Sequence, residues 1–133
     1  MKIGIVGYGQ IGKALARFYK KPFICDVDRC NLPQDLDIMH VSIPYSNEFP
    51  RIVSQYIETY KPKIVVIHST VRLGITHWLN EKYKGIVVHS PVRGVHPKLY
   101  EGIKTFVKYV GYDKRSTGKE EKIAFERLIG LGL

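Results

Sequence analysis

Short apolar runs alternate along this chain with segments in which apolar residues recur at helical spacing. The apolar runs predict six strands, over residues 3–6, 23–25, 37–44, 64–67, 86–88 and 105–110. Helical spacing predicts one helix from residue 11, one over 48–60, one between 71 and about 84, and a last one capped by Ser116 or Thr117. Strands that alternate with helices in this way are typical of an α/β fold with a mostly parallel sheet.

A glycine-rich turn follows the first apolar run. It contains Gly7, Gly9 and Gly12, and its other members are Tyr8, Gln10 and Ile11. The first glycine permits a tight turn, the second lets a pyrophosphate approach the backbone, and the third lets the helix pack closely on the strand. The start of the following helix favours a phosphate. With the strand before and the helix after it, this turn predicts a Rossmann-type, doubly wound fold with helices on both faces of the sheet, and it predicts dinucleotide binding. The alternative is a glycine-rich turn without a ligand.

An acidic residue at the end of the second apolar run supports the dinucleotide hypothesis. Asp26 lies nineteen residues after Gly7, where a carboxylate can accept hydrogen bonds from the adenosine ribose. The same carboxylate would repel the 2′-phosphate of NADP, so NAD is the predicted cofactor and NADP the second choice. Arg29, three residues later, could soften that repulsion.

Small hydroxyls, prolines and histidines recur where the later strands end. The cofactor-contacting residues predicted at these exits are Ser42, Ile43, Pro44, Tyr45, Ser69 and Thr70. In open parallel sheets ligands bind beyond the carboxyl ends of the strands, which would bring these residues to one crevice. The alternative is that serine, threonine and proline serve only as loop formers and helix caps.

Catalytic chemistry is predicted at the loop 89–97, next to the expected nicotinamide position. His89 and His96 could move the proton that accompanies hydride transfer, and Arg93 could hold an anionic substrate. Thr70 completes this predicted set, and His68 is a further strand-end histidine. The alternatives are a surface role for the arginine and structural, hydrogen-bonded roles for the histidines. No histidine pair has the spacing of a helical metal site.

Composition narrows the function further. The length of 133 residues predicts a single domain over residues 1–133. The sequence contains no run of about eighteen apolar residues, so we expect no membrane span. The net charge of +9 is spread along the chain without a dense basic tract, so we expect no specific nucleic-acid role. The first residues enter a strand without a signal-peptide pattern, which predicts a cytoplasmic protein. In that compartment Cys25 and Cys30 are expected to stay unpaired, although a disulfide between them is possible.

Three segments carry a resemblance to a known family: residues 4–14, 37–44 and 65–76. They resemble the N-terminal NAD-binding domain of nucleotide-sugar dehydrogenases, such as those acting on UDP-glucose or GDP-mannose, and the wider 6-phosphogluconate dehydrogenase-like family. The Ser-Thr-Val stretch at 69–71 is the more specific match, and the resemblance places Thr70 near the nicotinamide. The segment 89–97 is partly similar to the corresponding stretch of the family.

The departures from that family concern the substrate. Val92 stands where these dehydrogenases carry a glutamate, and neither cysteine lies where their nucleophile would be. The second, helical domain of the family is expected to be absent, so a substrate site would need a partner chain or a dimer. We therefore predict an NAD-binding domain of a dehydrogenase that acts on an unknown, anionic small molecule. The alternative is a non-catalytic NAD-binding or sensor module. Exposed sheet edges further predict a homodimer.

Overall fold

The computed structural model describes residues 1–83, 86–105 and 109–111. The helices and strands follow in the order β1 (Ile3–Val6), α1 (Gln10–Ala16), β2 (Phe23–Cys25), β3 (Ile38–Val41), α2 (Phe49–Tyr60), β4 (Ile64–Ile67), α3 (Ile75–Tyr83), β5 (Ile86–His89) and α4 (Leu99–Thr105). No helix in these ranges has both the length and the apolar character needed to cross a membrane.

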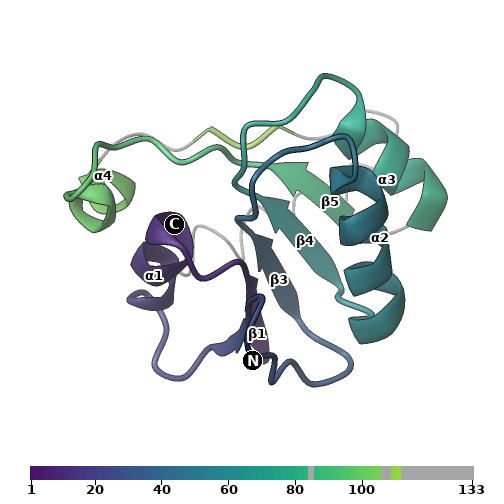
Figure 1. Cartoon of the computed structure of the whole chain (residues 1–133), viewed down its shortest axis with the longest axis horizontal. Coiled ribbons are helices and arrows are strands. Elements are labelled where there is room, and N and C mark those ends of the chain that lie inside the picture. Colours follow the sequence, from purple (N-terminus) through teal and green to yellow (C-terminus); the bar gives the residue numbers. More distant parts are fainter. Residues whose placement is uncertain (84–85, 106–108, 112–133) are drawn as a thin grey trace.

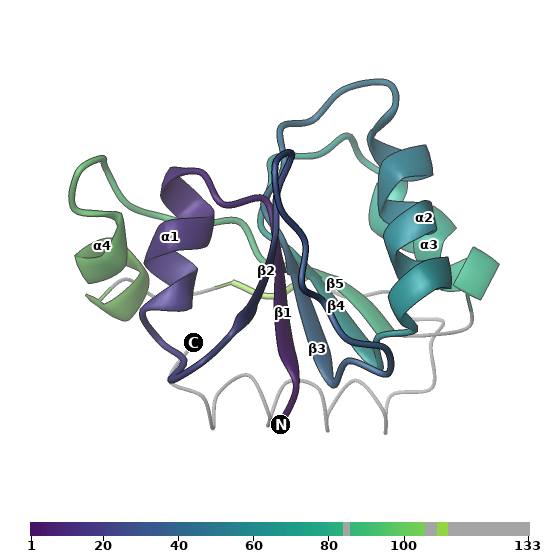
Figure 2. The same ribbon diagram turned by 60° about the horizontal axis from the view of Figure 1, so that its bottom comes forward.

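All five strands lie parallel in one sheet, in the order β2-β1-β3-β4-β5 (Figures 1 and 2). The chain first moves from β1 outward to β2 and then crosses back to β3 on the other side of β1. This reversal makes the carboxyl ends of β1 and β3 a topological switch point, where doubly wound sheets bind their ligands. The predicted α/β fold with a parallel sheet is confirmed.

Helices cover both faces of the sheet, as Figure 2 shows, with α1 and α4 on one face and α2 and α3 on the other. On the α2 and α3 face the core contains Val6, Met39 and Val65 from the strands and Phe49 from α2. On the α1 and α4 face, the cluster of buried residues comprises Ile5, Ala14, Leu15 and Ile103. Because both faces are buried, β1 and β4 contain only aliphatic residues and a glycine, and β3 is apolar except for His40, which explains why the pattern of the sequence located them.

A chain of buried polar side chains crosses the sheet on the α1 face. The Tyr19 hydroxyl lies 2.7 Å from His40 Nε2, and His40 Nδ1 lies 2.8 Å from His68 Nε2. His68 Nδ1 lies 2.9 Å from the carbonyl oxygen of Ser90. Because a carbonyl can only accept, His68 donates to Ser90. With both histidines neutral, this fixes the direction of the other two hydrogen bonds: His40 donates to His68, and Tyr19 donates to His40. Burial also raises the pKa of Tyr19, so its hydroxyl keeps the proton that it donates.

The C-terminal part differs from the prediction. Thr105, expected to begin a strand, is the last residue of α4, a helix that the sequence pattern missed. Residues 106–108 of that expected strand lie outside the described residues, as does the expected helix from Ser116 or Thr117. Gly111 forms an isolated antiparallel bridge with His89. Trp78 of α3 is 43% exposed, with the Lys82 ammonium 5.1 Å from its ring centroid.

Candidate functional site

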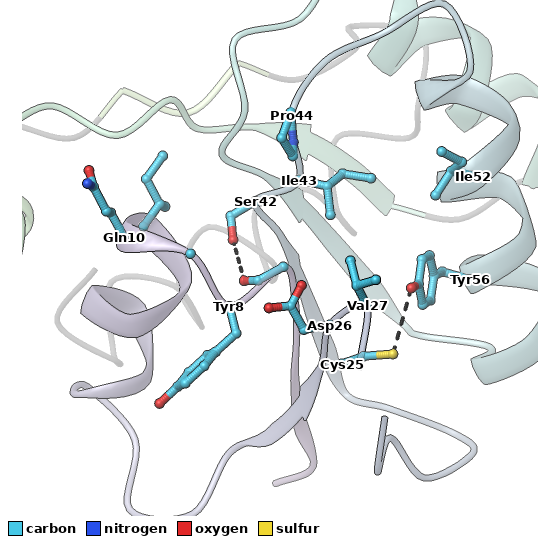
Figure 3. A pocket seen from close by; sticks show the side chains of 13 residues that line it. Tyr8, Gln10, Cys25, Asp26, Val27, Ser42, Ile43, Pro44, Ile52 and Tyr56 are labelled. Atoms are coloured by element: carbon cyan, nitrogen blue, oxygen red, sulfur yellow. Dashed lines mark hydrogen bonds between the residues drawn. The ribbon is translucent and has the colours of Figure 1, made fainter. Parts of the chain in front are cut away.

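A cavity of about 690 Å³ lies at the carboxyl ends of β1, β2 and β3. That volume is in the range of small-molecule and cofactor sites. Its walls come from the glycine-rich turn, the two strand exits beside it, and one face of α2 (Figure 3). The lining residues are Gly7, Tyr8, Gly9, Gln10, Ile11, Cys25, Asp26, Val27, Ser42, Ile43, Pro44, Ile52 and Tyr56.

The three glycines of the turn occupy three different environments. Gly7 has a φ of +90°, and a Cβ there would lie 2.8 Å from the carbonyl oxygen of Ser42. A Cβ on Gly12 would lie 1.9 Å from the carbonyl oxygen of Gly7, so α1 packs against the turn itself. A Cβ on Gly9 would meet no described atom within 4 Å. The protein therefore needs glycine at positions 7 and 12 for its own backbone, whereas the space above Gly9 is open.

Hydrogen bonds between neighbouring strand exits hold this edge of the sheet together. The Ser42 hydroxyl donates to the Gly7 carbonyl at 2.9 Å, a contact drawn in Figure 3, and the Ser69 hydroxyl donates to the Ile43 carbonyl at 2.6 Å. His89 Nε2 lies 2.9 Å from the Ser69 carbonyl, so this nitrogen carries a proton and donates it. Each exit thus fixes the backbone of the exit beside it. These side chains position the loops of the cavity.

Asp26 is the acidic group of the cavity. It follows β2 directly, and its backbone N–H donates to the Arg29 carbonyl at 2.7 Å, which closes a tight turn. Figure 3 shows its carboxylate beside the glycine-rich turn and next to Val27. The Arg29 guanidinium lies 5.0 Å from the centroid of the Tyr8 ring, so a cation stands at the rim of the same cavity.

The turn after β2 is closed by a disulfide between Cys25 and Cys30, contrary to our expectation of unpaired cysteines. The two residues form an antiparallel bridge that brings their Cα atoms within 4.0 Å of each other, a turn that the spacing alone did not reveal. The Tyr56 hydroxyl lies 3.7 Å from Cys25 Sγ and the Tyr60 hydroxyl 3.3 Å from Cys30 Sγ. Because a disulfide has no S–H, both tyrosines are the donors. The Asp26 turn is therefore held to α2.

Opening this disulfide should destabilise the fold by about 2 kcal/mol, the loop-closure entropy of a ring of roughly six residues. Cys30→Ser is the suitable variant because Cys30 is exposed, whereas Cys25 is buried in β2. Urea unfolding should show the same loss for Cys30→Ser and for the reduced wild type. A reductant should leave Cys30→Ser unchanged. Equal stability of the oxidised and reduced wild type would contradict the prediction.

Two residues of α2, Ile52 and Tyr56, line the cavity, a position that their spacing along the chain did not predict. Their helical spacing predicted a core-facing stripe, and the stripe indeed continues into the core at Phe49 and Val53. Ile52 and Tyr56 lie on the side of this stripe that borders the cavity. Burial, together with nearby Tyr60 and Asp26, raises the pKa of Tyr56, so its phenol stays protonated and able to donate.

The other predicted site residues lie outside this cavity. Tyr45 packs against Phe49, with 5.5 Å between the ring centroids, and Thr70 is exposed. Arg93 is exposed, with its guanidinium 5.5 Å from the Tyr109 ring centroid, and His96 lines a second cavity. His68 is buried, with both ring nitrogens in the polar chain that crosses the sheet. The structure thus brings together the glycine-rich turn, Asp26 and the β3 exit, but not the four residues predicted for catalysis.

Comparison with known proteins supports the fold. No family model matches the chain, and no curated protein matches it. Among solved structures, the chain is similar to the crystal structure of NDP-N-acetyl-D-galactosaminuronic acid dehydrogenase from Methanosarcina mazei Go1, with a TM-score of 0.61 and 16% sequence identity. The similarity covers 90% of this chain but 40% of that one. At this identity, what the two proteins share is a Rossmann-like α/β fold.

Proposed function

We propose that this protein binds NAD across the glycine-rich turn, as the cofactor domain of a dehydrogenase. The observation that carries the proposal is the open space above Gly9 within a cavity that also contains Asp26. Glycines are required by the fold at positions 7 and 12, whereas the absent side chain at Gly9 leaves a space that no described atom fills. A pyrophosphate at close range to the backbone is the group for which such turns are suited.

The remaining walls suit the adenosine half of the cofactor. Asp26 would accept hydrogen bonds from the ribose hydroxyls. Val27 and Ile52 offer apolar surface for the flat adenine ring, and the Tyr56 phenol, whose proton is donated to Cys25 Sγ, offers its oxygen as an acceptor. Ser42 would act indirectly, since its hydroxyl holds the Gly7 carbonyl. When bound, the nicotinamide ring would supply the capacity to accept or donate a hydride.

Cofactor preference provides a test of Asp26. Wild-type protein should bind NAD at least about tenfold more tightly than NADP, because the carboxylate repels the 2′-phosphate. Asp26→Asn should weaken NAD binding by about tenfold, the cost of one charged hydrogen-bond acceptor, and narrow the gap to NADP. Calorimetric titration of both cofactors measures the two affinities.

Asp28→Asn is the matched control for this test. It makes the same change of charge two residues away, at an exposed position outside the cavity lining. We expect its affinities for both cofactors to equal those of the wild type. Tighter NADP binding by the wild type, or equal effects of the two substitutions, would count against the role of Asp26.

A second candidate function is that of an NAD-responsive module without catalysis. It is favoured by the positions of Thr70, Arg93 and His96 outside the cavity and by the contact that His89 makes with the Ser69 carbonyl. Assaying NADH formation with nucleotide-sugar and other anionic substrates separates the two functions. Turnover by the wild type that falls in Arg93→Gln, with NAD affinity unchanged, would support the dehydrogenase and exclude the non-catalytic module.

A further inference from the structure

A second cavity, of about 390 Å³, lies between α1 and the start of α4. The two helices lie side by side on one face of the sheet (Figures 1 and 2). From α1 and its C-cap the lining includes Gln10, Lys13 and Arg17, which are spaced to share one helical face. From the other wall it includes His96, Leu99 and Tyr100. Cavity and helix face thus form one continuous, partly apolar hollow.

The polar lining of this hollow carries cationic side chains without a carboxylate. Lys13 and Arg17 supply an ammonium and a guanidinium group, and His96 adds a ring N–H donor. Within the part of the chain that the structure describes, no carboxylate pairs with Lys13 or Arg17, whereas Arg51 and Lys63 pair with Glu48 and Asp37. Two cations that share a concave site raise the local concentration of anions.

Arg17 is also held in a fixed orientation. Its guanidinium carbon lies 3.7 Å from the centroid of the Tyr100 ring, and that ring lies 4.8 Å from the ring of Phe18. A guanidinium stacked on an aromatic face keeps its in-plane N–H groups available for a bidentate anion. The arginine therefore loses little conformational freedom when it binds one.

We propose that this hollow binds the phosphate group of a small metabolite, at a site separate from the dinucleotide cavity. Two cations and a histidine N–H suit a phosphate dianion, and Leu99 and Tyr100 offer apolar surface to the rest of the molecule. The volume fits a compact phosphorylated molecule. Gln10 lines both cavities, so the bound phosphate lies next to the cofactor site.

Inorganic phosphate is the probe that tests this proposal, in NMR titrations of the ¹⁵N-labelled protein without dinucleotide and at constant ionic strength. We expect saturable shifts of the amides of residues 13–17 and 98–100. Lys13→Gln and Arg17→Gln should each weaken phosphate binding by about tenfold, as expected for the loss of one charged hydrogen-bonding partner. Lys20→Gln, an equal change of charge at an exposed residue outside the lining, should leave it unchanged.

Two further variants make the result unambiguous. Arg17→Gln also removes the contact with Tyr100, so Arg17→Lys, which keeps the charge, should bind phosphate more tightly than Arg17→Gln. Gly9→Val, which fills the space over the glycine-rich turn, should bind phosphate as the wild type does. Loss of phosphate binding in Gly9→Val with retention in Arg17→Gln would place the phosphate on the turn and overturn the proposal. Shifts that grow linearly with phosphate, or equal effects of Lys20→Gln and Lys13→Gln, would overturn it as well.

Discussion

Gly9→Val should abolish the binding of NAD while the protein remains folded. In the protein alone, a Cβ at this position meets no described atom within 4 Å, and Gly9 has an extended backbone with a φ of −74° that valine also adopts. The free energy of unfolding should therefore fall by no more than about 1 kcal/mol, the cost of a poor residue at a helix N-cap. With NAD bound, the valine side chain would occupy the volume of the pyrophosphate.

Calorimetric titration should show NAD affinity reduced by at least about a hundredfold, which corresponds to roughly 2.7 kcal/mol. Urea unfolding of the same sample establishes that the variant is folded. Wild-type affinity in a folded Gly9→Val protein would mean that the dinucleotide does not lie over this turn.

Gly12→Val, the same substitution three residues later, should have the opposite effect and unfold the protein. A Cβ at position 12 would lie 1.9 Å from the carbonyl oxygen of Gly7, and the contact joins two backbone segments that side-chain rotation cannot separate. The helix α1 would have to move away from β1, which would disrupt the packing of Ala14 and Leu15 against Ile5. Overpacking typically costs about 1–3 kcal/mol, and more where, as here, two backbone segments would collide, which is a large part of the stability of a small domain.

Far-ultraviolet circular dichroism and urea unfolding measure this loss. Gly12→Ala serves as the milder partner, since it places the same Cβ without the two extra methyl groups and should destabilise less. A Gly12→Val protein as stable as the wild type would contradict the close packing of α1 on the glycine-rich turn.

The central part of the fold could be predicted from the sequence because its signals are local. The strands β1, β3 and β4 are buried on both faces, so each is a short run in which apolar residues dominate, with His40 of β3 as the polar exception. The three glycines lie within six residues, so their spacing alone predicted the tight turn and the close packing of the following helix. Asp26 could be placed in the site because it directly follows β2, whose end is fixed by pairing with β1.

The features that could not be predicted depend on contacts between distant parts of the chain. The helix α4 contains Gly102, and the β-branched and aromatic residues after it predicted a strand; its packing against α1 decides the outcome. The helical spacing of Ile52 and Tyr56 predicted core positions, because spacing alone does not show where the core ends and a cavity begins. Ser42 and Ser69 were predicted to contact a ligand, but in the structure each hydroxyl donates its hydrogen bond to a backbone carbonyl of the neighbouring strand exit.

Dimerisation and the catalytic roles of Thr70, His89, Arg93 and His96 stay predictions. His96 nevertheless has a defined place, in the basic hollow between α1 and α4. An anionic substrate held there would lie beside the cofactor cavity through Gln10, which lines both. Binding of phosphate and binding of NAD can be measured separately, so the two proposals stand or fall independently.

A crystal structure of the protein grown with saturating NAD tests the central claim most directly. We expect density for the pyrophosphate over Gly9 and for the adenosine ribose within hydrogen-bonding distance of the Asp26 carboxylate, in the cavity at the ends of β1, β2 and β3. A dinucleotide bound elsewhere on the protein, or a cavity without dinucleotide density at saturating NAD, would contradict it.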